Sequence, residues 1–266
     1  MNSFILAFDE KIQVAIDELK YYEPPDGYYV CFSGGKDTVV MYDLIKRAGV
    51  KYEAVHNFIA IEPPPLIEFI KREYPEVIIK YPEQNIAELI IKNGIPPLRH
   101  IRYCHRELKK GGEGRIKVLG IRAQESPRRA SRSKFGENKF GGYDLNIIFD
   151  WTEQDIWRYI FKFNVKYCSL YDEGRKRIGC LFCPFGSSSQ MEMDLTEFPD
   201  IAQYLIDACQ AAIDRRNERR ILEAGKKRCP KESPFGNGKE MFFHWISREG
   251  GKDIEKLKSI YDAVSI

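Results

Sequence analysis

The sequence has no apolar run long enough to cross a bilayer, and its charges nearly cancel, with 42 Lys and Arg against 39 Asp and Glu. The missing run excludes a membrane-spanning helix, which needs about 20 consecutive apolar residues. A net charge of +3 does not by itself indicate a polyanionic partner. The sequence also contains no evident internal repeat or low-complexity tract.

Residues 1–10 lack the basic segment and following apolar run of a secretory signal, so we expect a soluble, cytoplasmic protein. In such a reducing compartment, seven cysteines indicate metal, cluster or thiol chemistry before disulfides. With 266 residues, 43% of them hydrophobic, the chain can bury a large core.

The most informative stretch is Tyr28–Thr38, which reads Tyr-Tyr-Val-Cys-Phe-Ser-Gly-Gly-Lys-Asp-Thr. It predicts a buried strand, a glycine turn and the first turn of a helix. This order creates an anion site, because glycines let the backbone approach a phosphate and the helix directs its N–H groups at it. The candidate phosphate-binding residues are Ser33, Gly34, Gly35, Lys36, Asp37 and Thr38.

The spacing of this loop is not that of the Walker motif. Ser-Gly-Gly-Lys-Asp instead resembles the pyrophosphate loop (PP-loop) of the adenine nucleotide α-hydrolase superfamily. The resemblance implies that the ligand is ATP, split between its α and β phosphates, or an adenylyl sulfate. Asp37 is a candidate ligand for Mg²⁺ bound with ATP, and the alternative is a carboxylate that favours the helix N-terminus.

Predicted strands alternate with predicted helices through the first two thirds of the chain. The strands are expected at 28–32, 50–57, 77–80, 116–120 and 144–149, and the first helix at 4–20. This alternation predicts an α/β fold, a mostly parallel sheet with helices on both faces. We expect residues 95–115 to be irregular and basic, residues 130–142 to form a mobile loop, and residues 190–224 to form two helices.

The predicted domains are a PP-loop nucleotide-binding domain over residues 1–186 and a helical C-terminal extension over 187–266, packed on it. The first domain carries a pair of cysteines in Gly179-Cys180-Leu181-Phe182-Cys183-Pro184. One such pair fits half of a zinc site, a redox couple or half of an iron–sulfur site. A cluster needs further thiolates, and the candidates are Cys104 and Cys168.

Four motifs occur in one order along the chain: Ser33–Asp37; Arg102-Tyr103-Cys104; Leu119–Arg122 with Glu125-Ser126 and Arg128-Arg129; and Arg177–Pro184. Together they resemble the phosphoadenosine phosphosulfate (PAPS) reductase family over about residues 28–186. In the iron–sulfur branch of that family, a Cys-Cys pair and a later C-x-x-C pair hold a four-iron four-sulfur (4Fe-4S) cluster.

The resemblance implies that Cys104, Cys180 and Cys183 are cluster ligands. Cys104 is followed by His105 and not by a second cysteine, so the fourth ligand is His105, Cys168 or absent. Zinc is the alternative metal, since it accepts Cys and His equally.

The resemblance also implies that the segment from Arg122 to Arg129 borders the substrate. Arg122 directly follows a predicted strand and Gly120, where its guanidinium could hold a phosphate or sulfate with two hydrogen bonds. The expected binding residues of this segment are Gly120, Arg122, Glu125, Ser126, Arg128 and Arg129. Lys36, Asp37 and Arg122 are the candidate catalytic residues.

Reductases of this family attack sulfur with a cysteine in a Glu-Cys-Gly-x-His segment. The sequence contains none, and Cys229 lies in Lys-Arg-Cys-Pro. We therefore expect ATP-dependent adenylation and sulfur transfer. The alternatives are reduction of PAPS or adenylyl sulfate to sulfite, and a nucleotide-binding subunit of a DNA-modification or defence complex. The basic 99–115 stretch makes tRNA or DNA a candidate acceptor, and a homodimer is left open.

Overall fold

The computed structural model describes residues 7–108, 110–138, 141–226, 229–247, 251 and 253–265. The chain divides into two compact units. Unit 1 contains Met1–Asn57, Pro64–Lys80 and Lys110–Ile178. Unit 2 contains Phe58–Pro63, Tyr81–Lys109 and Gly179–Ile266. The predicted boundary after residue 186 stays a prediction.

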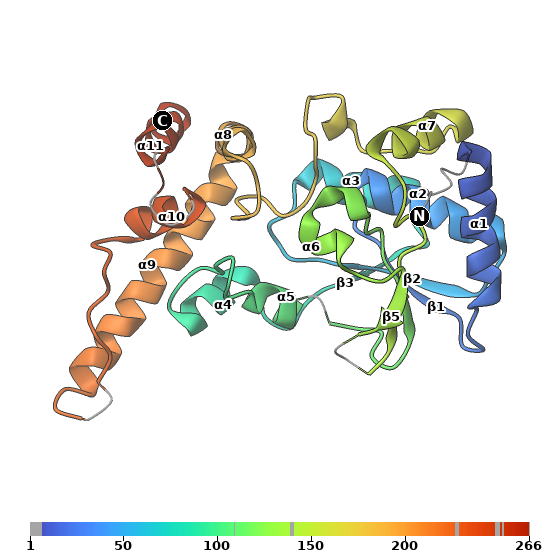
Figure 1. Cartoon of the computed structure of the whole chain (residues 1–266). Helices are drawn as coiled ribbons and strands as arrows, with labels where there is room; N and C mark the ends of the chain where they lie inside the picture. Colours follow the sequence, from blue (N-terminus) through green and yellow to red (C-terminus); the bar gives the residue numbers. More distant parts are fainter. Residues whose placement is uncertain are drawn as a thin grey trace. The chain divides into compact units, whose positions relative to one another are not determined.

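Unit 1 is built on a six-stranded sheet with the strand order β3-β2-β1-β4-β6-β5 (Figure 1). Its strands are β1 (Tyr28–Cys31), β2 (Tyr52–Asn57), β3 (Ile78–Lys80), β4 (Ile116–Val118), β5 (Phe135–Glu137) and β6 (Tyr143–Leu145). All neighbouring strands run parallel except β5, which is antiparallel to β6. The prediction of an α/β fold with a mostly parallel sheet is confirmed.

Strand β1 lies at the centre of this sheet and is buried on both faces. Tyr28 and Val30 belong to the main core of the unit, and Tyr29, on the opposite face, is only 4% exposed. From β1 the chain builds outward through β2 to β3, and then returns to the other side of β1 as β4. The direction of winding therefore reverses between β1 and β4. In parallel sheets, ligands bind outside the carboxyl ends of the two strands at such a reversal.

The helices of unit 1 are α1 (Phe8–Tyr21), α2 (Lys36–Ala48), α3 (Pro64–Glu73), α6 (Pro127–Ala130) and α7 (Glu153–Phe163), with short 3-10 turns η1 (Ala123–Glu125) and η2 (Ser169–Tyr171). Helix α2 packs against both α1 and α7. It ends at Gly49, which has a left-handed φ of 69° and closes the helix as the sequence predicts. Of the first predicted helix, Phe4 and Ile5 lie outside the described residues.

The prediction of a loop over 130–142 is wrong at Phe135–Glu137, because this strand pairs with Tyr143–Leu145 as a hairpin. Phe135 stacks between two tyrosines, Tyr22 at 4.4 Å and Tyr143 at 5.2 Å between ring centroids. The contact between Tyr22 and Phe135 joins residues far apart in the sequence, and local composition could not reveal it.

Unit 2 is helical and has its own core. Its helices are α4 (Ile86–Asn93), α5 (Tyr103–Leu108), α8 (Ser188–Glu197), α9 (Pro199–Leu222), α10 (Gly238–Ile246) and α11 (Ile254–Val264). Helix α9 packs against α4 and α10 (Figure 1). The two helices predicted in 190–224 are α8 and α9. The expectation that 95–115 is irregular is wrong at α5, whose Tyr103 and Leu108 are buried in this core.

Among the described residues, no helix combines the length and apolar character needed to cross a membrane. Helix α7 begins with a capping box, in which Thr152 Oγ1 accepts from Asp155 N at 3.1 Å and Asp155 Oδ2 accepts from Thr152 N at 2.8 Å. The same carboxylate pairs with Lys11 of α1 at 2.7 Å. The pair therefore ties the first helix of the chain to α7.

Asp155→Asn should lower the free energy of unfolding by about 1–3 kcal/mol at pH 7, the value of a charge-assisted hydrogen bond. Burial raises the pKa of Asp155, but hydrogen bonds from Lys11 and Thr152 outweigh this and hold the pKa below 3.8. A carboxylate whose pKa is lowered by folding stabilises the folded state at pH values above its unfolded pKa. This stabilisation is lost as the pH falls through the folded pKa. The difference between variant and parent should therefore shrink below about pH 4.

Denaturant melts between pH 3 and 7 measure this difference. Glu137→Gln, which removes an exposed carboxylate of β5, is the control and should show a smaller effect at every pH. A stability difference for Asp155→Asn that is independent of pH would contradict the assigned role of the ion pair.

Candidate functional site

The phosphate loop joins β1 to α2 and is held in shape by its own polar groups. Thr38 Oγ1 donates to Gly35 O at 2.9 Å and accepts from Ser33 N at 3.3 Å. The hydroxyls of Ser33 and Thr38 also hydrogen-bond to each other at 3.1 Å. The hydroxyls of Ser33 and Thr38, which the sequence predicts as phosphate donors, therefore hydrogen-bond within the loop.

Two glycines are required by the close packing around the loop. Gly34 has a φ of 73°, and a Cβ there would lie 2.7 Å from a methyl carbon of Leu66 in α3. Gly120 follows β4, and a Cβ there would lie 3.0 Å from Thr38 Cγ2 and 3.3 Å from Thr38 N. The end of β4 thus packs closely against the first turn of α2. This places the Gly120–Arg122 segment beside the loop.

Arg122 is buried and bonds directly to the loop helix. Its Nε donates to Asp37 Oδ1 at 2.6 Å, and the two side chains are 5% and 20% exposed. A second guanidinium nitrogen donates to Gln124 Oε1 at 3.1 Å. The structure therefore brings together two of the three predicted catalytic residues as an ion pair.

Lys36, the third of these residues, is also buried, with its side chain 6% exposed. Its ammonium donates to the carbonyl oxygen of Lys176 at 2.7 Å and lies 3.2 Å from the Glu153 carboxylate. Its backbone N–H, the first of α2, donates to the hydroxyl of Tyr171 at 2.9 Å. Burial raises the pKa of Tyr171 above its ordinary value, so this oxygen belongs to a neutral hydroxyl.

The remaining predicted residues of the second loop mainly organise that loop. Glu125 accepts from Arg122 N at 3.0 Å and pairs with Arg129. Ser126 caps the short helix α6 by accepting from Arg129 N at 3.2 Å. Arg128 is exposed. Glu125 and Arg129 thus support the backbone that carries Arg122.

Three groups at the loop have no signal in the sequence: the Tyr171 hydroxyl, the Glu153 carboxylate and the Lys176 carbonyl. In the sequence, Glu153 is simply an acidic residue near the start of a helix. Tyr171 ends the short 3-10 turn η2, where neither periodicity nor charge in the sequence indicates a contact with residue 36. Only the fold brings these residues, more than 110 positions along the chain, to the loop.

Three of the predicted metal ligands, Cys104, Cys180 and Cys183, lie in unit 2, together with His105. Cys104 is on α5, and both Cys104 and Cys180 pack against the second core. The C-x-x-C segment is tied to the segment before α5, because Arg99 Nε donates to Pro184 O at 2.8 Å. The guanidiniums of Arg99 and Arg102 also lie over the Phe185 ring, 5.4 and 4.9 Å from its centroid.

The turn between the paired cysteines is held by buried contacts. Phe182 has a φ of 56°, which is rare for a large side chain. Its N–H donates to the buried Asp194 carboxylate at 3.0 Å, and Leu181 N donates to Ile61 O at 2.8 Å. These bonds fix the backbone that carries Cys180 and Cys183.

The thiols of Cys104, Cys180 and Cys183 have the right chemistry for a metal centre. Among the described residues, no three His, Cys, Asp or Glu side chains are close enough to hold a metal ion. Cys168 is wholly buried in the core of unit 1, and burial raises the pKa of its thiol, which disfavours the thiolate that a ligand must supply. The identity of the fourth ligand stays a prediction.

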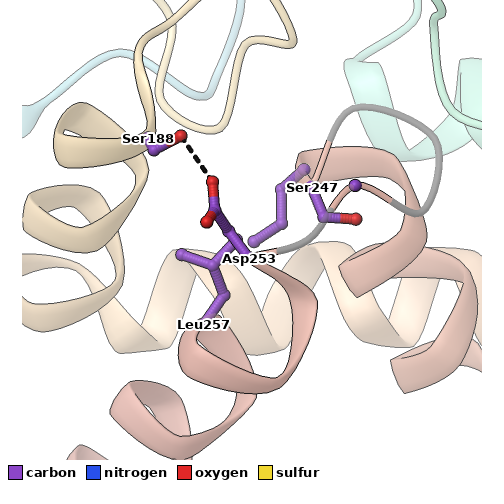
Figure 2. A pocket seen from close by; sticks show the side chains of 6 residues that line it. Ser188, Ser247, Asp253 and Leu257 are labelled. Carbon is purple, nitrogen blue, oxygen red and sulfur yellow. Dashed lines mark hydrogen bonds between the residues drawn. The ribbon is translucent and has the colours of Figure 1, made fainter.

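Unit 2 contains a small polar cavity of about 180 Å³ where α8 and α11 begin and α10 ends (Figure 2). Ser188 donates to Asp253 at 2.8 Å across it. A cavity this small is below the about 300 Å³ of typical ligand sites. It does not have the size or the cations that an adenine nucleotide needs.

The fold and the loop define the class of this protein: an α/β protein with a phosphate-type loop at the reversal point of a parallel sheet. The family model of the phosphoadenosine phosphosulfate reductase domain matches residues 27–185. The chain belongs to this family, as its motifs predict. Family relatives act on adenine nucleotides in sulfur metabolism.

Curated relatives agree with this assignment. The chain is 31% identical over 188 residues to an uncharacterized protein of Methanocaldococcus jannaschii, covering 65% of this chain and 39% of that protein. It is 30% identical over 170 residues to the adenosine 5'-phosphosulfate reductase of Bacillus pumilus, covering 58% of this chain and 72% of the relative. The chain thus spans less than half of the length of its archaeal relative.

Among solved structures, the chain is similar to the PAPS reductase of Candida auris in complex with phosphate. The TM-score is 0.47 at 17% identity, over 67% of this chain and 98% of the other.

A double-mutant cycle tests the ion pair of the site. Arg122→Met should lower the free energy of unfolding by about 1–3 kcal/mol, because it leaves the Asp37 carboxylate without its charged donor. Combining Arg122→Met with Asp37→Asn should cost less than the sum of the two single changes. Denaturant melts measure these values, and Arg128→Met on the same loop should stay within about 0.5 kcal/mol of the parent. Strictly additive effects would argue against the pair.

Proposed function

We propose that this protein binds ATP at the phosphate loop and uses it to adenylate a substrate, to which sulfur is then transferred. The observation that carries this proposal is the grouping of two buried cations, Lys36 and Arg122, with the N-terminus of α2 at the reversal point of the sheet. Such a site suits a ligand with several phosphates. The family, whose relatives act on adenine nucleotides, supports the adenine.

In the proposed reaction, pyrophosphate leaves when the substrate is adenylated, and AMP leaves when a sulfur nucleophile from a sulfur donor attacks the adenylated substrate. The N–H groups of the first turn of α2 bind the pyrophosphate oxygens, and the Lys36 ammonium neutralises the charge that develops on them. Arg122, oriented by Asp37, binds a neighbouring phosphate. Mg²⁺ enters with ATP as part of the substrate.

The choice of sulfur transfer over sulfate reduction rests on the cysteines beyond the C-x-x-C pair. Cys209 is buried in α9, and burial raises the pKa of its thiol to about 12, so it is a poor nucleophile. Cys229 does not stand in the Glu-Cys-Gly-x-His segment of the reductases. Because one relative is named adenosine 5'-phosphosulfate reductase, reduction of an adenylyl sulfate is the second candidate reaction.

We further propose that Cys104, Cys180 and Cys183 hold a 4Fe-4S cluster, which would supply a site to carry sulfur. Zinc is the alternative. The support is the three cysteines themselves and the contacts that tie their two segments together.

Lys36→Met should weaken ATP binding by about ten-fold or more, because it removes a buried charge that hydrogen-bonds to the ligand. Calorimetric titration with ATP measures this loss. Lys46→Met, at the other end of α2, removes an exposed lysine and is the matched control. Equal ATP affinity in the Lys36 variant and the parent would contradict the assigned site.

Product analysis separates the candidate reactions. Pyrophosphate release from ATP supports adenylation, and sulfite release from adenylyl sulfate with a thiol reductant supports reduction. Tight ATP binding with neither product supports a nucleotide-binding subunit.

Anaerobic purification with iron and sulfide assays and an absorption spectrum tests the cluster. Iron and sulfide should fall sharply in Cys180→Ser and stay at the parent level in Cys229→Ser. A colourless protein that contains only zinc, and is unaffected by Cys180→Ser, would contradict the cluster.

A further inference from the structure

The donors of the phosphate loop are already bonded to oxygen atoms of the chain itself. The Lys36 N–H donates to the Tyr171 hydroxyl at 2.9 Å. The Lys36 ammonium bonds to Lys176 O at 2.7 Å and pairs with Glu153 at 3.2 Å. Three oxygens from three residues therefore gather around the first residue of α2.

These oxygens make the contacts that a bound anion would make at this position. A phosphate at a helix N-terminus supplies oxygens to the first N–H groups and to a nearby lysine. Here a hydroxyl, a carbonyl and a carboxylate supply them instead. The Tyr171 hydroxyl lies against the glycine turn, 3.4 Å from the position of a Cβ on Gly35. A phosphate oxygen cannot accept from the Lys36 N–H while this hydroxyl does.

We propose that Tyr171, Glu153 and the Lys176 carbonyl form an internal substitute for a phosphate group, which the polyphosphate of the ligand displaces. This inference rests on the proposed function, since it concerns the same loop. It makes Tyr171 and Glu153 selectivity residues: a ligand must replace several oxygens and the charge of a carboxylate at once. Pyrophosphate has the oxygens and charge to do so, and a single phosphate has fewer of both.

Displacement also frees a particular stretch of chain. Residues 171–178 carry two of the three oxygens and run in sequence directly to Gly179 and Cys180. This stretch is held by the bonds from Lys36 and by turns such as the one in which Arg175 N donates to Leu170 O at 3.1 Å. Ligand binding should therefore loosen residues 171–178 while it protects the first turn of α2.

Tyr171→Phe should bind inorganic pyrophosphate about three- to ten-fold more tightly than the parent. The variant lacks the competing hydroxyl, and its unpaired Lys36 N–H gains a full hydrogen bond from the ligand. Glu153→Gln should bind about two- to five-fold more tightly, because the lost partner is a half-exposed carboxylate. Calorimetric titrations with pyrophosphate and with phosphate measure both effects.

Two variants of unit 1 serve as matched controls. Tyr167→Phe removes a hydroxyl that bonds to Asp172, and Glu137→Gln removes an exposed carboxylate. Both should bind pyrophosphate like the parent. In hydrogen exchange, pyrophosphate should speed exchange in 171–178 of the parent and slow it in 35–39, and the first effect should be smaller in Tyr171→Phe.

The outcomes separate this inference from the proposed function. If the parent binds pyrophosphate and neither Tyr171→Phe nor Glu153→Gln binds it more tightly, the inference is wrong and the phosphate site stands. Weaker binding by Tyr171→Phe with an unchanged melting temperature would also overturn it, because the hydroxyl would then support the ligand. If the parent binds neither pyrophosphate nor ATP, both proposals fail. If Tyr171→Phe does not fold, two other measurements test the inference: the pyrophosphate affinity of Glu153→Gln and the hydrogen exchange of residues 171–178 in the parent.

Discussion

The close approach of β4 to the first turn of α2 is the constraint on which the site depends. At position 120 even a Cβ would press on Thr38, 3.0 Å from its Cγ2 and 3.3 Å from its N, so glycine suits this approach. Because the two segments meet there, Arg122 reaches Asp37, and two cations become buried within one small region. Burying cations is unfavourable without partners, so the chain supplies Asp37, Glu153 and a carbonyl. The same partners define what a ligand has to replace.

The phosphate loop and its approximate fold could be predicted because their signals are local. A buried strand, two glycines and an amphipathic helix stand next to one another in the sequence, and Gly49 and Thr152 mark helix ends by their own chemistry. The contacts of Tyr171, Glu153 and Phe135 could not be predicted, because each depends on a partner more than 100 residues away. The sequence also predicts too long a strand at 144–149, because the strand β6 ends at Leu145.

The cysteines show a different limit of sequence reasoning. Their residue types and spacing indicate a thiolate centre, and the structure adds an ordered turn at Phe182 and a clamp of two arginines on Phe185. A metal site, however, requires ligands on different segments to be positioned to within a few tenths of an ångström. Spacing in sequence fixes such distances only within the C-x-x-C pair.

The division into two units also determines how the chain can be cut. Each unit is assembled from three separate pieces, and the chain passes between them five times, the last time between Ile178 and Gly179. No single cut therefore releases either unit as a continuous polypeptide. A fragment that ends at Ile178 keeps the two pieces of the helical unit that follow β2 and β3, but it lacks α9, against which α4 packs.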